Sequence, residues 1–100
     1  MNTTFKKEDN DYVMYFDGRL DTAASSKALK EAEVLYDCEG HDIILDCTDL
    51  SYISSSGLRI FLNILKNAKL KGSRVYLRGV NDDIKEVFLM TGFNSLFEFK

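Results

Sequence analysis

The first part of the chain has the hydrophobic pattern of a β-hairpin. Residues 4–8 and 12–16 are short runs rich in aromatic and β-branched side chains, and the turn-forming sequence Asp-Asn-Asp separates them. In the second run both faces are largely apolar, which predicts a strand inside a sheet rather than at its edge. We expect Gly18 to end this strand.

Apolar residues then recur with the spacing of a helix. Either Asp21 or Thr22 is a suitable N-cap, and the small and apolar residues that follow are four, four and three positions apart: Ala24, Ala28, Ala32 and Leu35. This pattern predicts an amphipathic helix that ends near Gly40. Residues 43–45 follow as a continuous apolar run between two aspartates, which predicts a buried strand at the centre of the sheet.

The second half of the chain predicts two more helices and two more strands. Residues 49–56 have the composition of a polar loop, and an amphipathic helix is expected from about Gly57 to Leu70, with this core stripe: Leu58, Phe61, Leu62, Leu65 and Ala68. Ile60 and Ile64 lie beside the stripe and are either a flank of the core or a partner surface. A strand over 74–78, a helix between Asn81 and Gly92, and a short strand over 96–99 complete the chain.

The predicted order of elements is ββαβαβαβ. Strands that alternate with helices form a mainly parallel sheet packed against the helices, and the N-terminal β-hairpin adds an antiparallel edge. One hundred residues correspond to one domain, so we expect a single α/β domain over residues 1–100. A core of this size leaves little room for a deep pocket, which counts against a conventional enzyme.

Composition and charge narrow the function further. The 25 residues from Ser55 to Gly79 contain six basic and no acidic side chains, whereas the rest of the chain has seven basic and sixteen acidic ones. This asymmetry concerns partners rather than fold. An overall charge of −3 and a single aromatic on the basic strand argue against nucleic acid as a partner. No apolar run is long enough to cross a membrane, so we expect a soluble, cytoplasmic protein.

The candidates for metal binding and catalysis are few. Two cysteines without a signal peptide indicate reduced thiols. Cys38, His41 and Cys47 could bind zinc in principle, but a fourth ligand is missing, and a surface loop explains them better. His41 is the only histidine that could activate a serine, and neither a nucleophile elbow nor a glycine-rich phosphate loop is present. We therefore expect neither a cofactor nor a stand-alone enzyme.

The segment 45–59 reads Leu-Asp-Cys-Thr-Asp-Leu-Ser-Tyr-Ile-Ser-Ser-Ser-Gly-Leu-Arg and leads from a buried strand into a helix. Loops of this kind, at the carboxyl ends of strands, are where α/β proteins place their sites. The segment resembles the signature of the STAS domain of bacterial anti-sigma factor antagonists. Residues 18–22 (Gly-Arg-Leu-Asp-Thr) resemble that family's entry to its first helix, and residues 87–93 resemble the end of a later helix.

The resemblance implies a regulatory module of transcription. In that family the unmodified protein binds an anti-sigma factor, often also a serine kinase, and phosphorylation of a loop serine breaks the complex until a serine phosphatase removes the phosphate. Position relative to the glycine makes Ser55 the phosphoacceptor and gives Ser56 the helix-cap role. Ser54 stands where the family commonly has Asp, and the chain stops at Lys100, where many members continue into a further helix. The partner-binding residues expected from the resemblance are Asp21, Ser54, Ser56, Gly57, Leu58, Arg59 and Asn63.

Residue chemistry alone leaves alternatives open. A phosphate on a serine at a helix N-terminus is tolerated because the helix dipole favours negative charge there, so modification is expected to act on binding and not on folding. The serine run could equally be a simple capping segment, and Arg59, Asn63 and Lys66 could be a solvated helix face. The alternative function is a constitutive STAS-type scaffold or ligand-binding module that has lost the phosphorylation switch. The sequence does not indicate the oligomeric state.

Overall fold

Five strands form one sheet, and their order in space is their order along the chain. The computed structural model describes all residues from 1 to 100. The strands are β1 (Asn2–Glu8), β2 (Asp11–Leu20), β3 (Ile43–Ile53), β4 (Val75–Arg78) and β5 (Glu98–Phe99). The pair β1–β2 is antiparallel and the other three pairs are parallel. The predicted mainly parallel sheet, its N-terminal hairpin and its central strand β3 are confirmed.

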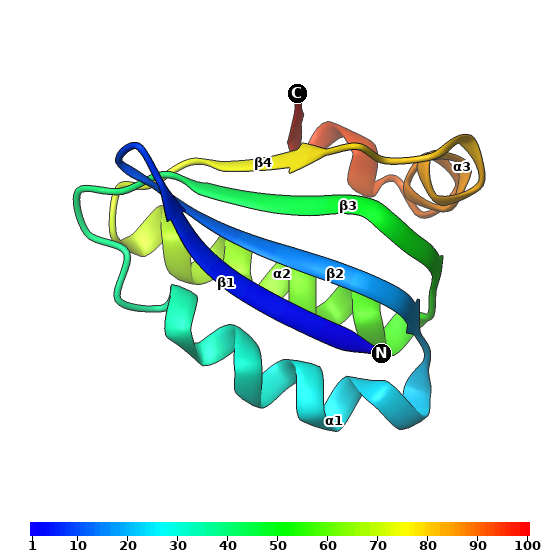
Figure 1. Ribbon diagram of the computed structural model, residues 1–100. Helices are drawn as coiled ribbons and strands as arrows, with labels where there is room; N and C mark the ends of the chain where they lie inside the picture. The colour runs from blue at the N-terminus through cyan, green and yellow to red at the C-terminus, as the bar shows by residue number, and fades with distance from the viewer.

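Three helices connect the parallel strands: α1 (Thr22–Glu31), α2 (Ser55–Leu70) and α3 (Asp82–Thr91). Two short 3₁₀ segments follow α1 and α3, namely η1 (Ala32–Leu35) and η2 (Phe93–Ser95). Figure 1 shows α1 and α2 side by side along one face of the sheet. Asp21 and Asn81 cap α1 and α3 as predicted, and Gly92 ends α3 in the left-handed conformation. None of the helices combines the length and the apolarity needed to cross a membrane.

The hydrophobic core lies between the sheet and this helix layer. Its aromatic centre is Phe61 of α2, whose ring centroid is 5.1 Å from that of Phe16 on β2 and 6.2 Å from that of Phe88 on α3. Ile60 and Ile64 are both buried, so they belong to the core. Leu62 of the predicted core stripe is only half-buried.

The strands are longer than the sequence pattern predicts. Gly18 lies inside β2, where its φ of +109° accompanies a shift in the register with β3, so it accommodates an irregularity instead of ending the strand. The predicted polar loop begins too early, because β3 continues to Ile53 with buried side chains at Leu50 and Ile53. The regular part of the first helix ends at Glu31, well before Gly40.

The other face of the sheet is covered by its own polar side chains. Arg78 on β4 donates from Nε to Oδ2 of Asp46 on β3 at 2.8 Å and from Nη2 to the Tyr15 hydroxyl at 3.2 Å. Its Nη1 lies 3.5 Å from Oε1 of Glu8, and the Tyr15 hydroxyl also donates to Glu8. Four strands therefore share one network. Burial alone would raise the pKa of Asp46, but hydrogen bonds from Thr48 and the charge of Arg78 hold it below its usual value.

The network predicts a pH dependence of stability. Replacing Asp46 by Asn should lower the free energy of unfolding at neutral pH by about 1 to 3 kcal/mol, because the Arg78 guanidinium loses the nearer of its two charged partners. The folded-state pKa of Asp46 lies below the unfolded value, so its contribution is present above about pH 4 and is lost as the pH falls further. In urea unfolding the difference between the two proteins should therefore be constant above about pH 4 and shrink as the pH falls below that value. A difference that stays constant below that value would contradict the prediction; the exposed Asp49→Asn is the control.

Candidate functional site

The first two helices begin side by side at the carboxyl ends of the neighbouring strands β2 and β3. Leu20 and Ile53 are register partners at the ends of β2 and β3, and α1 and α2 start immediately after them. The backbone amide of Ser54 donates to the carbonyl of Leu20 at 2.9 Å and joins the two strand ends directly. Two of the three segments that carry the family resemblance, residues 18–22 and 45–59, therefore meet here.

Ser54 is the N-cap of α2. Its backbone is extended, with φ −88° and ψ 172°, and its hydroxyl accepts a hydrogen bond from the amide of Gly57 at 3.2 Å. The cap role predicted for Ser56 is wrong: the helix begins at Ser55, two residues earlier than expected, because β3 extends to Ile53. Ser54 is only 8% exposed, and its role in partner binding stays a prediction. Ser56 is half-buried in the first turn.

Ser55 is the exposed member of the serine run. It is the first residue of α2, and its hydroxyl takes part in none of the side-chain hydrogen bonds, whereas the hydroxyl of Ser54 is occupied by the cap. The first turn of α2 contains no acidic side chain. A negative group on Ser55 would thus meet free helix amides and no opposing carboxylate within its own turn.

Gly57 allows α2 to approach the sheet closely. A Cβ atom there would lie 2.8 Å from Cγ of Leu20 and 2.9 Å from Cγ1 of Ile53. Gly57 and Leu58 are both buried, and their role in partner binding stays a prediction. They hold the start of the helix against the ends of β2 and β3.

The other predicted residues of α2 line a shallow groove between α1 and α2. The groove has a volume of about 230 Å³ and is formed by Ser25, Ser26, Leu29, Ser56, Arg59, Ile60 and Asn63. The structure thus brings Ser56, Arg59 and Asn63 together. The sequence pattern did not identify Leu29, because this residue lies outside the alanine stripe of α1. An apolar residue next to such a stripe is the signal that could have identified it.

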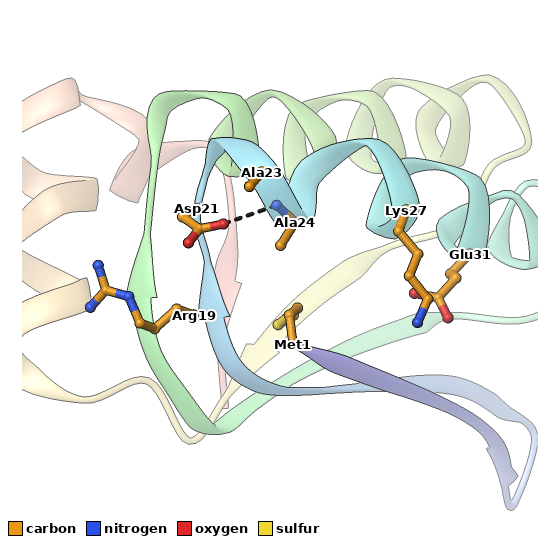
Figure 2. A pocket seen from close by; sticks show the side chains of 7 residues that line it. All are labelled: Met1, Arg19, Asp21, Ala23, Ala24, Lys27 and Glu31. Atoms are coloured by element: carbon orange, nitrogen blue, oxygen red, sulfur yellow. Dashed lines mark hydrogen bonds between the residues drawn. The ribbon is translucent and has the colours of Figure 1, made fainter.

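Asp21 lies apart from this groove. Its Oδ1 accepts a hydrogen bond from the amide of Ala24 at 2.9 Å, and it lines a second recess of about 490 Å³ between α1 and the start of β1. Figure 2 shows this recess, whose charged side chains are of both signs: Arg19, Asp21, Lys27 and Glu31. The Arg19 guanidinium also lies 4.4 Å from the centre of the Tyr52 ring.

The basic stretch of sequence is not one basic surface. Arg78 pairs with Asp46 and Glu8 on the open face of the sheet, Arg74 lies 3.8 Å from Glu98, and Lys71 lies 3.1 Å from Glu39. The cations of this stretch without an ion pair are all on α2: Arg59, Lys66 and Lys69. Of these three, Arg59 is nearest in sequence to Ser55 and lines the groove.

The residues considered for zinc do not form a metal site. Cys38 and Cys47 are buried free thiols, not residues of a surface loop, and burial raises the pKa of Cys47 to about 12. His41 stacks on Tyr12 at 4.3 Å between ring centres, and its Nδ1 lies 2.7 Å from the carbonyl of Asn10. No group of three or more His, Cys, Asp or Glu side chains is arranged to hold a metal ion.

The fold and the Ser-Ser-Ser-Gly-Leu helix start define a STAS domain. The chain matches the STAS domain family over residues 2–100 and belongs to it. Among similar proteins, the anti-sigma-B factor antagonist of Staphylococcus epidermidis is 32% identical over 89 residues, which cover 88% of this chain and 82% of that protein. The anti-sigma-B factor antagonist of Listeria monocytogenes is 29% identical over 96 residues, which cover 95% of this chain and 84% of that protein.

Solved structures show the same fold at lower sequence identity. An anti-sigma factor antagonist (STAS) domain protein from Planctomyces limnophilus superimposes with a TM-score of 0.89 at 14% identity, over 98% of this chain and 87% of that one. The Bacillus cell fate determinant SpoIIAA, in its phosphorylated form, superimposes with a TM-score of 0.74 at 18% identity, over 99% of this chain and 91% of that one. Together these matches establish the STAS architecture for the whole chain.

The cap assignment predicts different effects for the three adjacent serines. Ser54→Ala should lower the free energy of unfolding by about 1 kcal/mol, because the amide of Gly57 loses its acceptor. Ser55→Ala and Ser56→Ala should change it by less than about 0.5 kcal/mol. Chemical denaturation of the three variants measures these differences, and a larger loss for Ser56→Ala than for Ser54→Ala would show that the cap is misassigned.

Proposed function

We propose that this protein is an anti-sigma factor antagonist whose binding is switched off by phosphorylation of Ser55. The observation that carries the proposal is the arrangement of the serine run: Ser54 caps the helix, while Ser55 beside it is exposed and free. The relatives named above as anti-sigma-B factor antagonists cover nearly the whole chain, which supports the same role here. The protein acts as a binding module, and its partners are an anti-sigma factor, a serine protein kinase and a serine phosphatase.

Phosphorylation of Ser55 leaves the fold intact. The phosphate stands at the first position of α2, where the helix dipole and free amides favour negative charge by about 0.3 to 1 kcal/mol. The capping hydroxyl of Ser54 is untouched. The modification therefore acts on the surface that a partner meets.

Ser54 stands where the family commonly has Asp, and this difference is compatible with an exposed Ser55. Asp and Ser are comparable N-caps, because each accepts a hydrogen bond from an amide of the first turn. Ser54 performs that cap here by accepting from Gly57. The substitution thus preserves the geometry that exposes Ser55, although it removes a negative charge next to the phosphoacceptor.

Electrostatics makes one phosphate sufficient for a switch. A phosphate carries about 1.5 to 2 negative charges, and at about 5 Å from a partner carboxylate with an effective dielectric constant near 20 the repulsion is roughly 5 kcal/mol before solvent screening. One third of that value changes an affinity by more than about tenfold. SpoIIAA, whose solved structures include an unphosphorylated and a phosphorylated form, is a neighbour in fold for which both states exist.

Direct binding measurements test the proposal. Each anti-sigma factor encoded in the same genome is purified and titrated with the unmodified protein and with protein carrying phosphoserine at position 55. At least one should bind the unmodified protein, and the phosphate should weaken that complex at least about tenfold, more strongly at low salt than at high salt. Ser55→Ala should bind like the unmodified protein and resist the kinase, and Ser56→Ala is the matched control that is still phosphorylated.

Two results would contradict the proposal. Binding to none of the anti-sigma factors would exclude the antagonist role. Equal affinity with and without the phosphate would leave the antagonist role and exclude the switch, and it would favour the constitutive scaffold instead.

A further inference from the structure

The groove between α1 and α2 has an apolar floor at the end of the molecule that carries Ser55. Ile60 of α2 is 3% exposed and Leu29 of α1 is 40% exposed, and both line the groove. Single exposed leucines are common on protein surfaces. Leu29 differs from them because it lines a recess together with the buried side chain of Ile60.

The rim of the groove carries positive charge only. Arg59 is the one ionisable residue among its lining residues, and the other polar ones are serines and an asparagine. Arg59 has no ion pair, whereas the basic residues that follow α2 are each paired with a carboxylate: Lys71, Arg74 and Arg78. Neither α1 nor α2 has an acidic residue in its first turn. The charge that complements this groove is a carboxylate.

The size of the groove favours a side chain over a free small molecule. Its volume of about 230 Å³ falls below the roughly 300 to 1,000 Å³ that is usual for small-molecule sites. The recess is also bounded by two helices and open to solvent, so it cannot enclose a nucleotide or a metabolite on several sides. An aliphatic side chain that projects from a protein surface fits both properties.

We infer that the groove is the docking point for a protein segment that presents an aliphatic side chain and, within one helical turn of it, a carboxylate. The aliphatic group lies between Leu29 and Ile60, and the carboxylate pairs with Arg59. This inference rests on the proposed function of this end of the molecule as a protein-binding surface, and it specifies the chemistry of the partner.

The same arrangement ties the modification of Ser55 to the groove. Arg59 follows Ser55 by four positions on α2, the spacing at which side chains of a helix meet. A phosphate on Ser55 pairs with Arg59 and so competes with the partner's carboxylate for the only cation of the groove. The switch then has two effects, repulsion of the partner and occupation of its binding group.

A library of displayed helical peptides, selected on the immobilised full chain, tests the docking point without the natural partner. Enriched peptides should carry Leu, Ile, Val or Met within one turn of Asp or Glu. Their affinity should fall at least about tenfold for Arg59→Glu and for Leu29→Gln. It should be unchanged for Lys66→Glu, an exposed cation farther along α2, and for Leu70→Gln, a leucine that is 86% exposed at the end of α2. Circular dichroism and urea unfolding confirm that all four variants are folded.

The outcomes separate this inference from the proposed function. Enrichment of basic peptides, no enrichment, or binding that survives both groove variants overturns the docking point, while an anti-sigma factor can still bind elsewhere. Peptides that meet the expected pattern support the docking point even where no anti-sigma factor binds. Phosphoserine at position 55 should reduce the peptide affinity more in the protein with its native Arg59 than in the Arg59→Gln variant. Equal reductions in the two proteins would overturn the competition for Arg59.

Discussion

The close approach of α2 to the ends of β2 and β3 is the constraint on which the rest of the site depends. Gly57 leaves no space for a Cβ atom between the helix and the side chains of Leu20 and Ile53. The amide of Ser54 binds the carbonyl of Leu20 in the same region, so the chain reaches its helix at one fixed position. Ser54 then has to cap the helix, and Ser55 has to be the first residue on the outside. The exposure of one serine in a run of three thus follows from packing beneath it.

Much of the fold could be predicted from the sequence because each element carries its own local signals. Two runs of aromatic and β-branched residues around a turn predicted the hairpin, and helical spacing predicted the helices. Asp21 marked the start of α1, and Asn81 and Gly92 marked the two ends of α3. The errors concern lengths, which depend on pairing between strands. Gly18 remains within β2, and β3 continues to Ile53, because the two strands pair along their whole extent. A pattern read along one strand does not contain that information.

The site was predictable in position but not in detail. The loop at the end of β3 was predicted from its residues, and Ser55 was chosen by the family resemblance from its position relative to the glycine. The same comparison gave the cap role to Ser56, whereas Ser54 caps the helix. The run of basic residues does not form one surface, because partners distant in sequence pair with several of them, as Glu8 and Asp46 do with Arg78. The contribution of Leu29 depends on how α1 packs beside α2, which no local pattern reveals.

The stability of the Gly57→Ala variant is the most direct test of the claim that close packing at Gly57 positions the site. Helix propensity by itself favours alanine over glycine inside a helix by up to about 1 kcal/mol. Packing acts in the opposite direction, because the added methyl group would have to displace Leu20 and Ile53, both of which are buried. We predict a net loss of about 1 to 2 kcal/mol in the free energy of unfolding by urea denaturation. A variant as stable as the parent, or more stable, would contradict the claim that close packing at Gly57 positions the site.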